Sequence, residues 1–202
     1  MIPSHDPRVN LKVLEAAVDQ FAAYLRSGSI AHPIVVTVEG HTYRPSISIG
    51  FVRELVRELA QRAPDLDADG RARLAALAQE LEAVGSTHAA DYAGHLQREL
   101  KSHLDTWRYF LDDCARASEE CAENYQAEVR ARTRIAHLLA EAAAHGVDSA
   151  GARTRLAELD RVLDRLVEPG PFAGPAGQAE RYPEGEYPWL YRRPRRPSLS
   201  VA

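Results

Sequence analysis

Residues 86–145 contain no proline and a single interior glycine, Gly94, although the rest of the chain uses both residue types freely. Nothing in this stretch argues for an interruption. One continuous helix at about 1.5 Å per residue would be about 85 to 90 Å long, far beyond the usual length in a globular domain. Because single soluble chains rarely expose so much apolar surface, we expect a second copy or another protein to cover part of this helix.

Apolar residues follow two rows along the predicted helix. A heptad register that begins at Leu96 has mostly apolar a and d positions, with polar interruptions such as His103. A second apolar row lies beside this seam, so the stripe is wider than a two-stranded coiled coil needs. Cys114 and Cys121 would lie about 10 Å apart along a straight helix, too far to bridge, so we expect reduced thiols.

The rest of the chain predicts shorter helices, one hairpin and an extended arm. Hydrophobic periodicity and end signals predict four further helices, at about 7–26, 51–62, 71–84 and 150–167. A β-branched run and a Glu39-Gly40 turn predict a β-hairpin at about 34–49. The expected fold is all-α: an elongated antiparallel bundle around one very long central helix, with a helical domain at 1–169 and a C-terminal arm at 170–202.

Composition narrows the classes of partner. The formal net charge of −4 is too small to predict that the body of the protein binds nucleic acid or a membrane surface. No early apolar run has a signal-peptide pattern, and no run of about eighteen apolar residues could span a bilayer. We therefore expect a cytoplasmic protein. The sequence predicts no cofactor, since phosphate-binding glycine loops and paired zinc cysteines are absent from it.

Asp65, Asp67, Asp69 and Gly70 form the most specific local pattern in the chain. Their spacing between two helices resembles the first half of an EF-hand loop, which implies calcium bound by carboxylates. The position of the bidentate glutamate is Ala76, however, which removes the strongest ligand. Capping of the following helix is the favoured interpretation, with a metal site as the alternative.

His95, Glu99 and His103 are spaced by four residues, so they share one helix face and could supply metal ligands in a helical bundle. A matching set begins at His137, but the two sets would lie about 63 Å apart along one helix and could not form one site. We favour histidines with structural roles and keep a metal-binding bundle as an alternative.

Arg98 and His103 also resemble the R-x4-6-H motif of HEPN ribonucleases, and Arg132 and His137 repeat the spacing. The resemblance covers only these residues. It implies a dimeric helical bundle and a metal-independent ribonuclease in which the arginine stabilises phosphorane charge and the histidine is the general base. In an arginine-rich chain the spacing is expected by chance, so this is an alternative function.

The C-terminal arm has an extended, proline-fixed backbone with aromatic residues followed by arginines. Such side chains contribute most at protein interfaces. The predicted partner-binding residues are Tyr187, Trp189, Tyr191, Arg192, Arg193, Arg195 and Arg196. Three interpretations stay open: an arm that crosses a partner or second subunit, a nucleic-acid contact, and an arm that folds back on its own bundle.

Together these features favour a non-enzymatic structural or assembly protein. We expect a helical scaffold that forms a homodimer or docks into a larger complex through its long helix and its arm. The HEPN-like ribonuclease and the metal-binding bundle are the alternatives.

Overall fold

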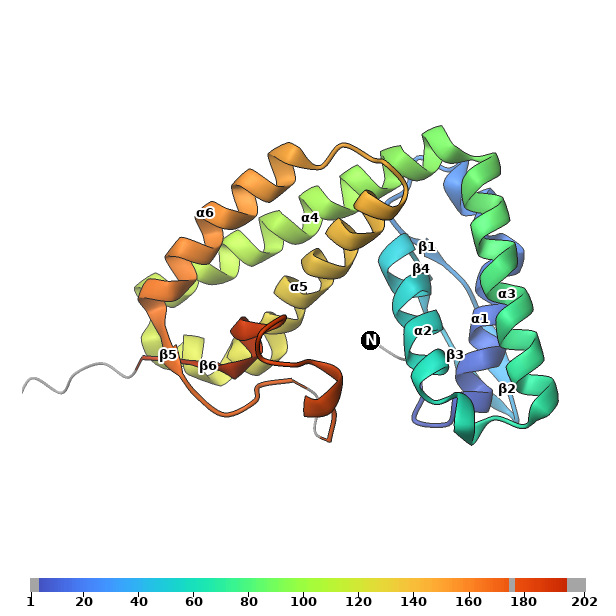
Figure 1. The fold of residues 1–202 in the computed structure, drawn as a ribbon, viewed down its shortest axis with the longest axis horizontal. Coiled ribbons are helices and arrows are strands. Elements are labelled where there is room, and N and C mark those ends of the chain that lie inside the picture. The colour runs from blue at the N-terminus through green and yellow to red at the C-terminus, as the bar shows by residue number, and fades with distance from the viewer. Residues whose placement is uncertain (1–3, 175–176, 196–202) are drawn as a thin grey trace, which may run out of the picture. The chain divides into compact units, whose positions relative to one another are not determined.

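The computed structural model describes residues 4–174 and 177–195, and this part of the chain is mostly helical with small antiparallel two-stranded sheets (Figure 1). The chain divides into two compact units, residues 1–99 (unit 1) and residues 100–202 (unit 2). The division falls within helix α4, Ala89–Arg116, rather than at the start of the C-terminal arm. No helix in the described ranges is long and apolar enough to cross a membrane.

Helix α1 is the centre of unit 1. It begins after Asp6, whose carboxylate accepts a hydrogen bond from the backbone N–H of Arg8, and Pro7 occupies the first turn, as the sequence predicted. Its apolar face is buried against helices α2 and α3 and against strands β2 (Val36–Val38) and β4 (Ser46–Ile47). The helices of unit 1 are α1 (Pro7–Leu25), α2 (Ile49–Gln61), the 3-10 turn η1 (Ala63–Asp65), α3 (Ala68–Thr87) and the first part of α4.

The predicted hairpin is present and packs on the helices of unit 1 through α1 and α2. Glu39 and Gly40 at its tip have φ angles of 50° and 80°, a left-handed turn that matches the twist of the flanking strands. Ile34 and Ile47 are buried on its inner side. The paired strands are β1 (His32–Pro33) with β4 (Ser46–Ile47), and β2 (Val36–Val38) with β3 (His41–Tyr43).

The prediction of one helix over residues 86–145 is wrong. Helix α3 continues through Gly85 to Thr87, and α4 begins only after His88. Helix α4 then ends at Arg116, and α5 occupies Ser118–Ala144. The stretch therefore belongs to three helices, although it has no proline and only one interior glycine.

Ala117 is the point at which the chain turns from α4 into α5. Its backbone is extended, with φ −137° and ψ 91°. Cys114 and Cys121 form a disulfide across this turn, with their Cα atoms 4.6 Å apart. The expectation of reduced thiols is wrong because it assumed a straight helix through Ala117.

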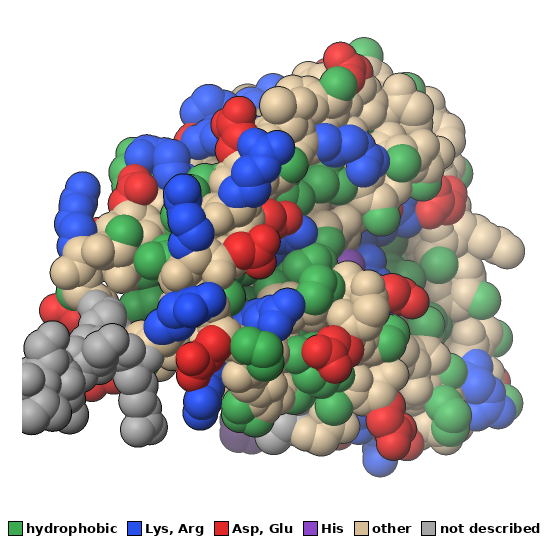
Figure 2. Space-filling model, turned by 60° about the vertical axis from the view of Figure 1, so that its left-hand side comes forward, with side chains coloured by type: hydrophobic (Ala, Val, Ile, Leu, Met, Phe, Trp, Pro, Cys, Tyr) green, Lys and Arg blue, Asp and Glu red, His purple; other side chains and the backbone are tan. Residues whose placement is uncertain are grey.

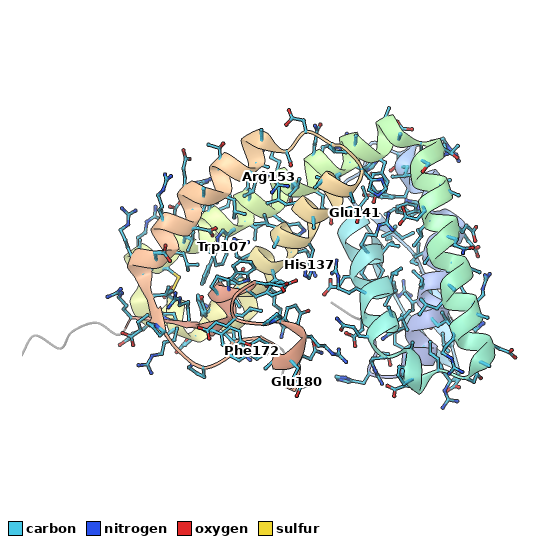
Figure 3. All side chains as sticks on the ribbon, in the orientation of Figure 1. Trp107, His137, Glu141, Arg153, Phe172 and Glu180 are labelled. Atoms are coloured by element: carbon cyan, nitrogen blue, oxygen red, sulfur yellow. A yellow bond between two sulfur atoms is a disulfide. The ribbon has the colours of Figure 1, made fainter. Side chains whose placement is uncertain are left out.

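Unit 2 packs α4 and α5 with α6, and the arm closes against them. Trp107 is fully buried and points into this helical core (Figure 3). Asp105 on α4 pairs with Arg155 on α6, and hydrogen bonds from Lys101 and then Arg155 lower the pKa of Asp105 to about 2. The remaining elements are α6 (Ala150–Leu166), β5 (Val167–Pro169), η2 (Ala179–Arg181), η3 (Pro188–Tyr191) and β6 (Arg192–Pro194).

Replacement of Gly40 by alanine tests the turn of the hairpin. Gly40→Ala should lower the free energy of unfolding by about 1 kcal/mol, because a Cβ is disfavoured at positive φ. The control is Gly28→Ala, at a glycine that has open space around it and no positive φ. Denaturant titration of both variants measures the difference, and equal stability would contradict the assigned turn.

Candidate interaction surface

Trp189 holds the C-terminal arm against α5 of the same chain. Its indole Nε1–H donates to Thr133 Oγ1 at 2.9 Å, and the Tyr125 hydroxyl donates to the backbone carbonyl of Trp189 at 2.8 Å. Burial raises the pKa of Tyr125, so its hydroxyl keeps the proton that it donates. The arm thus folds back on its own helices, which was one of the three interpretations left open by the sequence.

Arg132 links α5, α6 and the arm. Its Nε and Nη2 donate to the two carboxylate oxygens of Asp160 on α6, both at 2.8 Å, which is the bidentate geometry. Its guanidinium carbon lies 3.7 Å from the centroid of the Trp189 ring, a cation–π contact. The side chain of Arg132 is only 8% exposed, whereas that of Asp160 is 35% exposed, so the arginine end of the pair is the buried one. Arg132 is therefore a structural residue rather than half of an R-x4-H catalytic motif.

Around buried Trp189, four half-buried rings of the arm form an aromatic cluster, Phe172, Tyr182, Tyr187 and Tyr191. Neighbouring ring centroids are 5.1 to 6.3 Å apart. His137 of α5 lies beside the cluster, where its Nε2 is 3.3 Å from the Tyr187 hydroxyl, and Figure 3 labels both His137 and Phe172. The rings hold the arm together and still present part of their area to solvent.

The arginines that follow the aromatic cluster lie in strand β6 and its end. Arg193 pairs with Glu168 of strand β5 at 2.8 Å, and Arg195 Nε donates to the Val167 carbonyl. Arg192 is half-buried, and Arg196 lies outside the described residues. On the face that Figure 2 shows, basic and acidic side chains are interspersed, without the single-sign track that a phosphate backbone favours. We define the arm surface as the exposed parts of the aromatic cluster together with Arg192 and Arg193.

His95 and Glu99 join α4 to other elements of unit 1. Glu99 accepts hydrogen bonds from the Ser48 hydroxyl at 2.7 Å and from the Gly50 N–H at 3.1 Å, at the start of α2. His95 Nε2 donates to the carbonyls of Leu25 and Ser27, at the end of α1. Both side chains are almost fully buried, so a substrate in solution cannot reach them.

The electrostatics of His95 favour its neutral form. Burial, and then the charge of Arg98, lower its pKa. Nδ1 is buried and has no hydrogen-bond partner in the described structure, so a proton there would be a buried charge without compensation. The ring of Tyr24 lies 4.4 Å from that of His95, and burial together with the Glu99 charge raises the pKa of Tyr24. This cluster is a polar part of the core.

Arg98 and His103 lie on different sides of one helix. Both lie on α4, where Arg98 is exposed and His103 is half-buried. Five residues along one helix separate two side-chain directions by about 140°. The second pair with this spacing, Arg132 and His137, is also engaged in other contacts, because Arg132 is paired with Asp160 and His137 lies against Tyr187.

The aspartates of the EF-hand-like segment have helix-end roles. Asp67 caps α3 by accepting a hydrogen bond from the Gly70 N–H at 2.7 Å. Asp65 pairs with Arg62, and Asp69 lies in the first turn of α3. Among the residues that the structure describes, no group of three histidine, cysteine, aspartate or glutamate side chains could hold a metal ion. The metal alternatives at these aspartates and at His95, Glu99 and His103 therefore find no site in the described part of the chain.

No protein-family model, curated protein or solved structure matches this chain. The candidate surface is therefore located from the contacts within this structure and not from a related protein. Arg132, Thr133 and Asp160 are the residues that sequence reasoning missed as anchors of the arm. The sequence placed all three on predicted helices and marked Arg132 only through its spacing to His137, since contacts between residues 28 or 56 positions apart leave no local pattern.

The buried His95 predicts a pH dependence for unit 1. Its folded-state pKa lies below the unfolded value of about 6.5, so the unfolded state takes up the proton more readily. Stability should be full above pH 6.5, fall as the pH drops below it, and level off below the folded-state pKa. His95→Gln should flatten this part of the profile, whereas His41→Gln, at an exposed histidine, should keep it. Denaturation midpoints between pH 4.5 and 8, in roughly half-unit steps, decide the matter.

The buried contacts of Trp189 predict how much the docked arm contributes to the stability of unit 2. Trp189→Ala should destabilise unit 2 by about 3 to 5 kcal/mol through lost packing. Thr133→Val, which leaves the indole N–H without its acceptor, should cost about 1 to 3 kcal/mol. Tyr109→Ala, at a 60% exposed ring, is the control and should change stability by less than about 0.5 kcal/mol. Proteolysis within residues 177–187 should accelerate only in the first two variants, and an unchanged cleavage rate would contradict the assigned seat.

Proposed function

We infer that this chain is a non-enzymatic helical scaffold that binds another protein, and that the arm surface is its binding site. The observation that carries this proposal is the aromatic cluster, which stays half-exposed although Trp189 beneath it is buried. Tyrosine, tryptophan and arginine are the side chains enriched at the energetic centres of protein interfaces. The arm thus offers an ordered platform rather than a free tail.

The binding mode follows from the order of the arm. Because Trp189 is anchored in its own chain, the partner contacts come from Tyr182, Tyr187 and Tyr191 and from the neighbouring arginines. A pre-seated arm loses little conformational entropy on binding, which favours affinity. The fitting partner is a protein surface with apolar area for the rings and carboxylates for Arg192 and Arg193.

The contacts of the polar residues that could have had chemical roles support a binding role over an enzymatic one. His95, Glu99 and Arg132 have structural hydrogen bonds, and Asp67 caps a helix. The ribonuclease alternative has its two residues on different sides of one helix, and the metal alternative has no ligand group in the described ranges. No specific observation favours either alternative. A cytoplasmic location stays part of the proposal.

Photo-crosslinking in the native cell tests the proposed surface. A photoreactive phenylalanine analogue at Tyr182 or Tyr187 should form a covalent adduct with one reproducible protein, because both rings border solvent. The matched control position is Glu80, exposed on α3, which should give no adduct with that protein. Adducts that are equal at the arm and at Glu80, or absent from the arm, would contradict the proposal.

A second measurement checks affinity. Arg192→Ser combined with Tyr187→Ser should reduce the yield of the crosslinked partner, and of the native assembly that contains it, by at least about tenfold, since interface hot spots contribute about 2 kcal/mol or more each. Arg71→Ser with Glu80→Ser, on the exposed face of α3, should leave the yield unchanged.

A further inference from the structure

The turn between α4 and α5 is a single non-helical residue in a sequence that favours helix. Residues 113–122 contain neither glycine nor proline, and alanine at 117 has the highest helix propensity of all residues. Alanine is also a poor N-cap, and no side-chain hydrogen bond caps α5. The local sequence therefore does not account for the break.

The backbone hydrogen bonds are helical on both sides of Ala117. Its N–H donates to the Asp113 carbonyl at 2.9 Å, and its carbonyl accepts from the Cys121 N–H at 3.0 Å. Both connect residues four apart, as in an α-helix. A continuous helix would also satisfy the N–H groups that the first turn of a separate α5 leaves without helical partners.

The disulfide and a continuous helix exclude each other. Residues seven apart on a helix have Cα atoms about 10.5 Å apart, whereas a disulfide requires less than about 7 Å. In the structure this distance is 4.6 Å for Cys114 and Cys121. The covalent bond is therefore the feature that holds the break at Ala117.

The packing of α5 and α6 on α4 determines how the chain responds when this bond opens. The rings of Phe110 and Tyr125 lie 6.3 Å apart across the two helices of the hairpin, and Asp105 pairs with Arg155 of α6. One chain that straightened alone would expose this core. Two chains that straighten side by side re-form every such contact, with α4 of one copy against α5 and α6 of the other.

We propose that the Cys114–Cys121 disulfide is a redox switch of self-association. In the oxidised chain α4 and α5 form a closed hairpin within one molecule. In the reduced chain they join through Ala117, and two copies exchange the segment from α5 onward. The partner is thus a second copy of this chain, which supplies the α5 and α6 that complete each core.

The redox step is a thiol–disulfide exchange with a small dithiol. One thiolate of the reductant attacks a cysteine sulfur, which breaks the S–S bond, releases the other cysteine as a thiolate and leaves a mixed disulfide. The second thiolate of the reductant then attacks the reductant sulfur of the mixed disulfide and releases the remaining cysteine as a thiolate. The reductant leaves as a cyclic disulfide, and Cys114 and Cys121 each gain one electron and one proton. Both cysteines are buried, so reduction needs transient opening of the hairpin end. A reducing compartment favours the exchanged form and an oxidising one the closed form.

The redox switch is independent of the arm surface, since the exchanged segment carries the arm with it unchanged. The two proposals fail separately: the exchange is read from the mass of the purified protein alone, and the arm surface from crosslinks to another protein.

The test compares the oxidised and reduced full-length chain after refolding from denaturant at high protein concentration, so that slow opening of the hairpin does not decide the result. Light scattering should give the mass of one chain for oxidised protein and twice that mass in dithiothreitol. The variant Cys114→Ser/Cys121→Ser should have the doubled mass without reductant. Far-ultraviolet circular dichroism should show equal or higher helix content in the dimers.

Ser118→Pro is the matched control because it favours the hairpin and disfavours the continuous helix. Residue 118 is the first residue of α5, where proline is well accommodated, and Ala117 before it already has the extended backbone that proline prefers. Inside a continuous helix the same proline would break the hydrogen-bond ladder. Added to the cysteine-free variant, Ser118→Pro should restore the single-chain mass, whereas Ser118→Ala should leave the dimer.

Two outcomes would overturn the proposal. The first is one mass for the oxidised, reduced and cysteine-free proteins at every concentration. The second is a reduced dimer that persists with Ser118→Pro, since this would place the association on another surface.

Discussion

The closure of the chain at Ala117 is the constraint on which unit 2 depends. Because the disulfide brings Cys114 and Cys121 together, α5 runs back along α4. That reversal places Arg132 and Thr133 where Trp189 can dock, and it positions α6 for the ion pairs of Asp105 and Asp160. Without it the apolar rows of the two helices would need another chain to cover them.

The buried polar groups also hold distant parts of the chain together, because most of them connect elements that are far apart in sequence. Glu99 ties α4 to the start of α2, His95 ties it to the end of α1, and Arg132 ties α5 to α6 and to the arm. Their hydrogen bonds offset most of the cost of burial, while His95 Nδ1 and Arg132 Nη1 stay buried without a partner among the described residues. Residues that could have had catalytic or metal-binding roles, judged from the sequence, thus connect and fix the elements of the fold.

The sequence predicted the features that are encoded locally. The Asp6-Pro7 helix start, the Glu39-Gly40 turn, the capping role of Asp67 and the helices α2, α3 and α6 follow from propensities and end signals within a few residues. The break at Ala117 could not be predicted this way, since it depends on a covalent bond that forms only if the helix is already broken.

The candidate surface shows the same limit. The aromatic and arginine content of the arm predicted an interface, but nothing local distinguished docking in cis from docking in trans. The contacts of Trp189 with Thr133 and Arg132 span more than fifty residues, and periodicity carries no information about such pairs. The sequence therefore predicted an interface from the composition of the arm and did not predict which of its residues face solvent.

The long proline-free stretch acquires a different meaning once the disulfide is taken into account. Its apolar rows do require a partner surface, and in the oxidised chain that partner is the other half of the same stretch. A sequence that needed only a hairpin would be expected to carry glycine, proline or a capping residue at the turn, as the hairpin tip at Gly40 and the start of α3 at Asp67 do. Alanine at 117 leaves the continuous helix accessible to the sequence. The disulfide, which can form and break reversibly, then decides whether the apolar rows are covered within one chain or by a second copy.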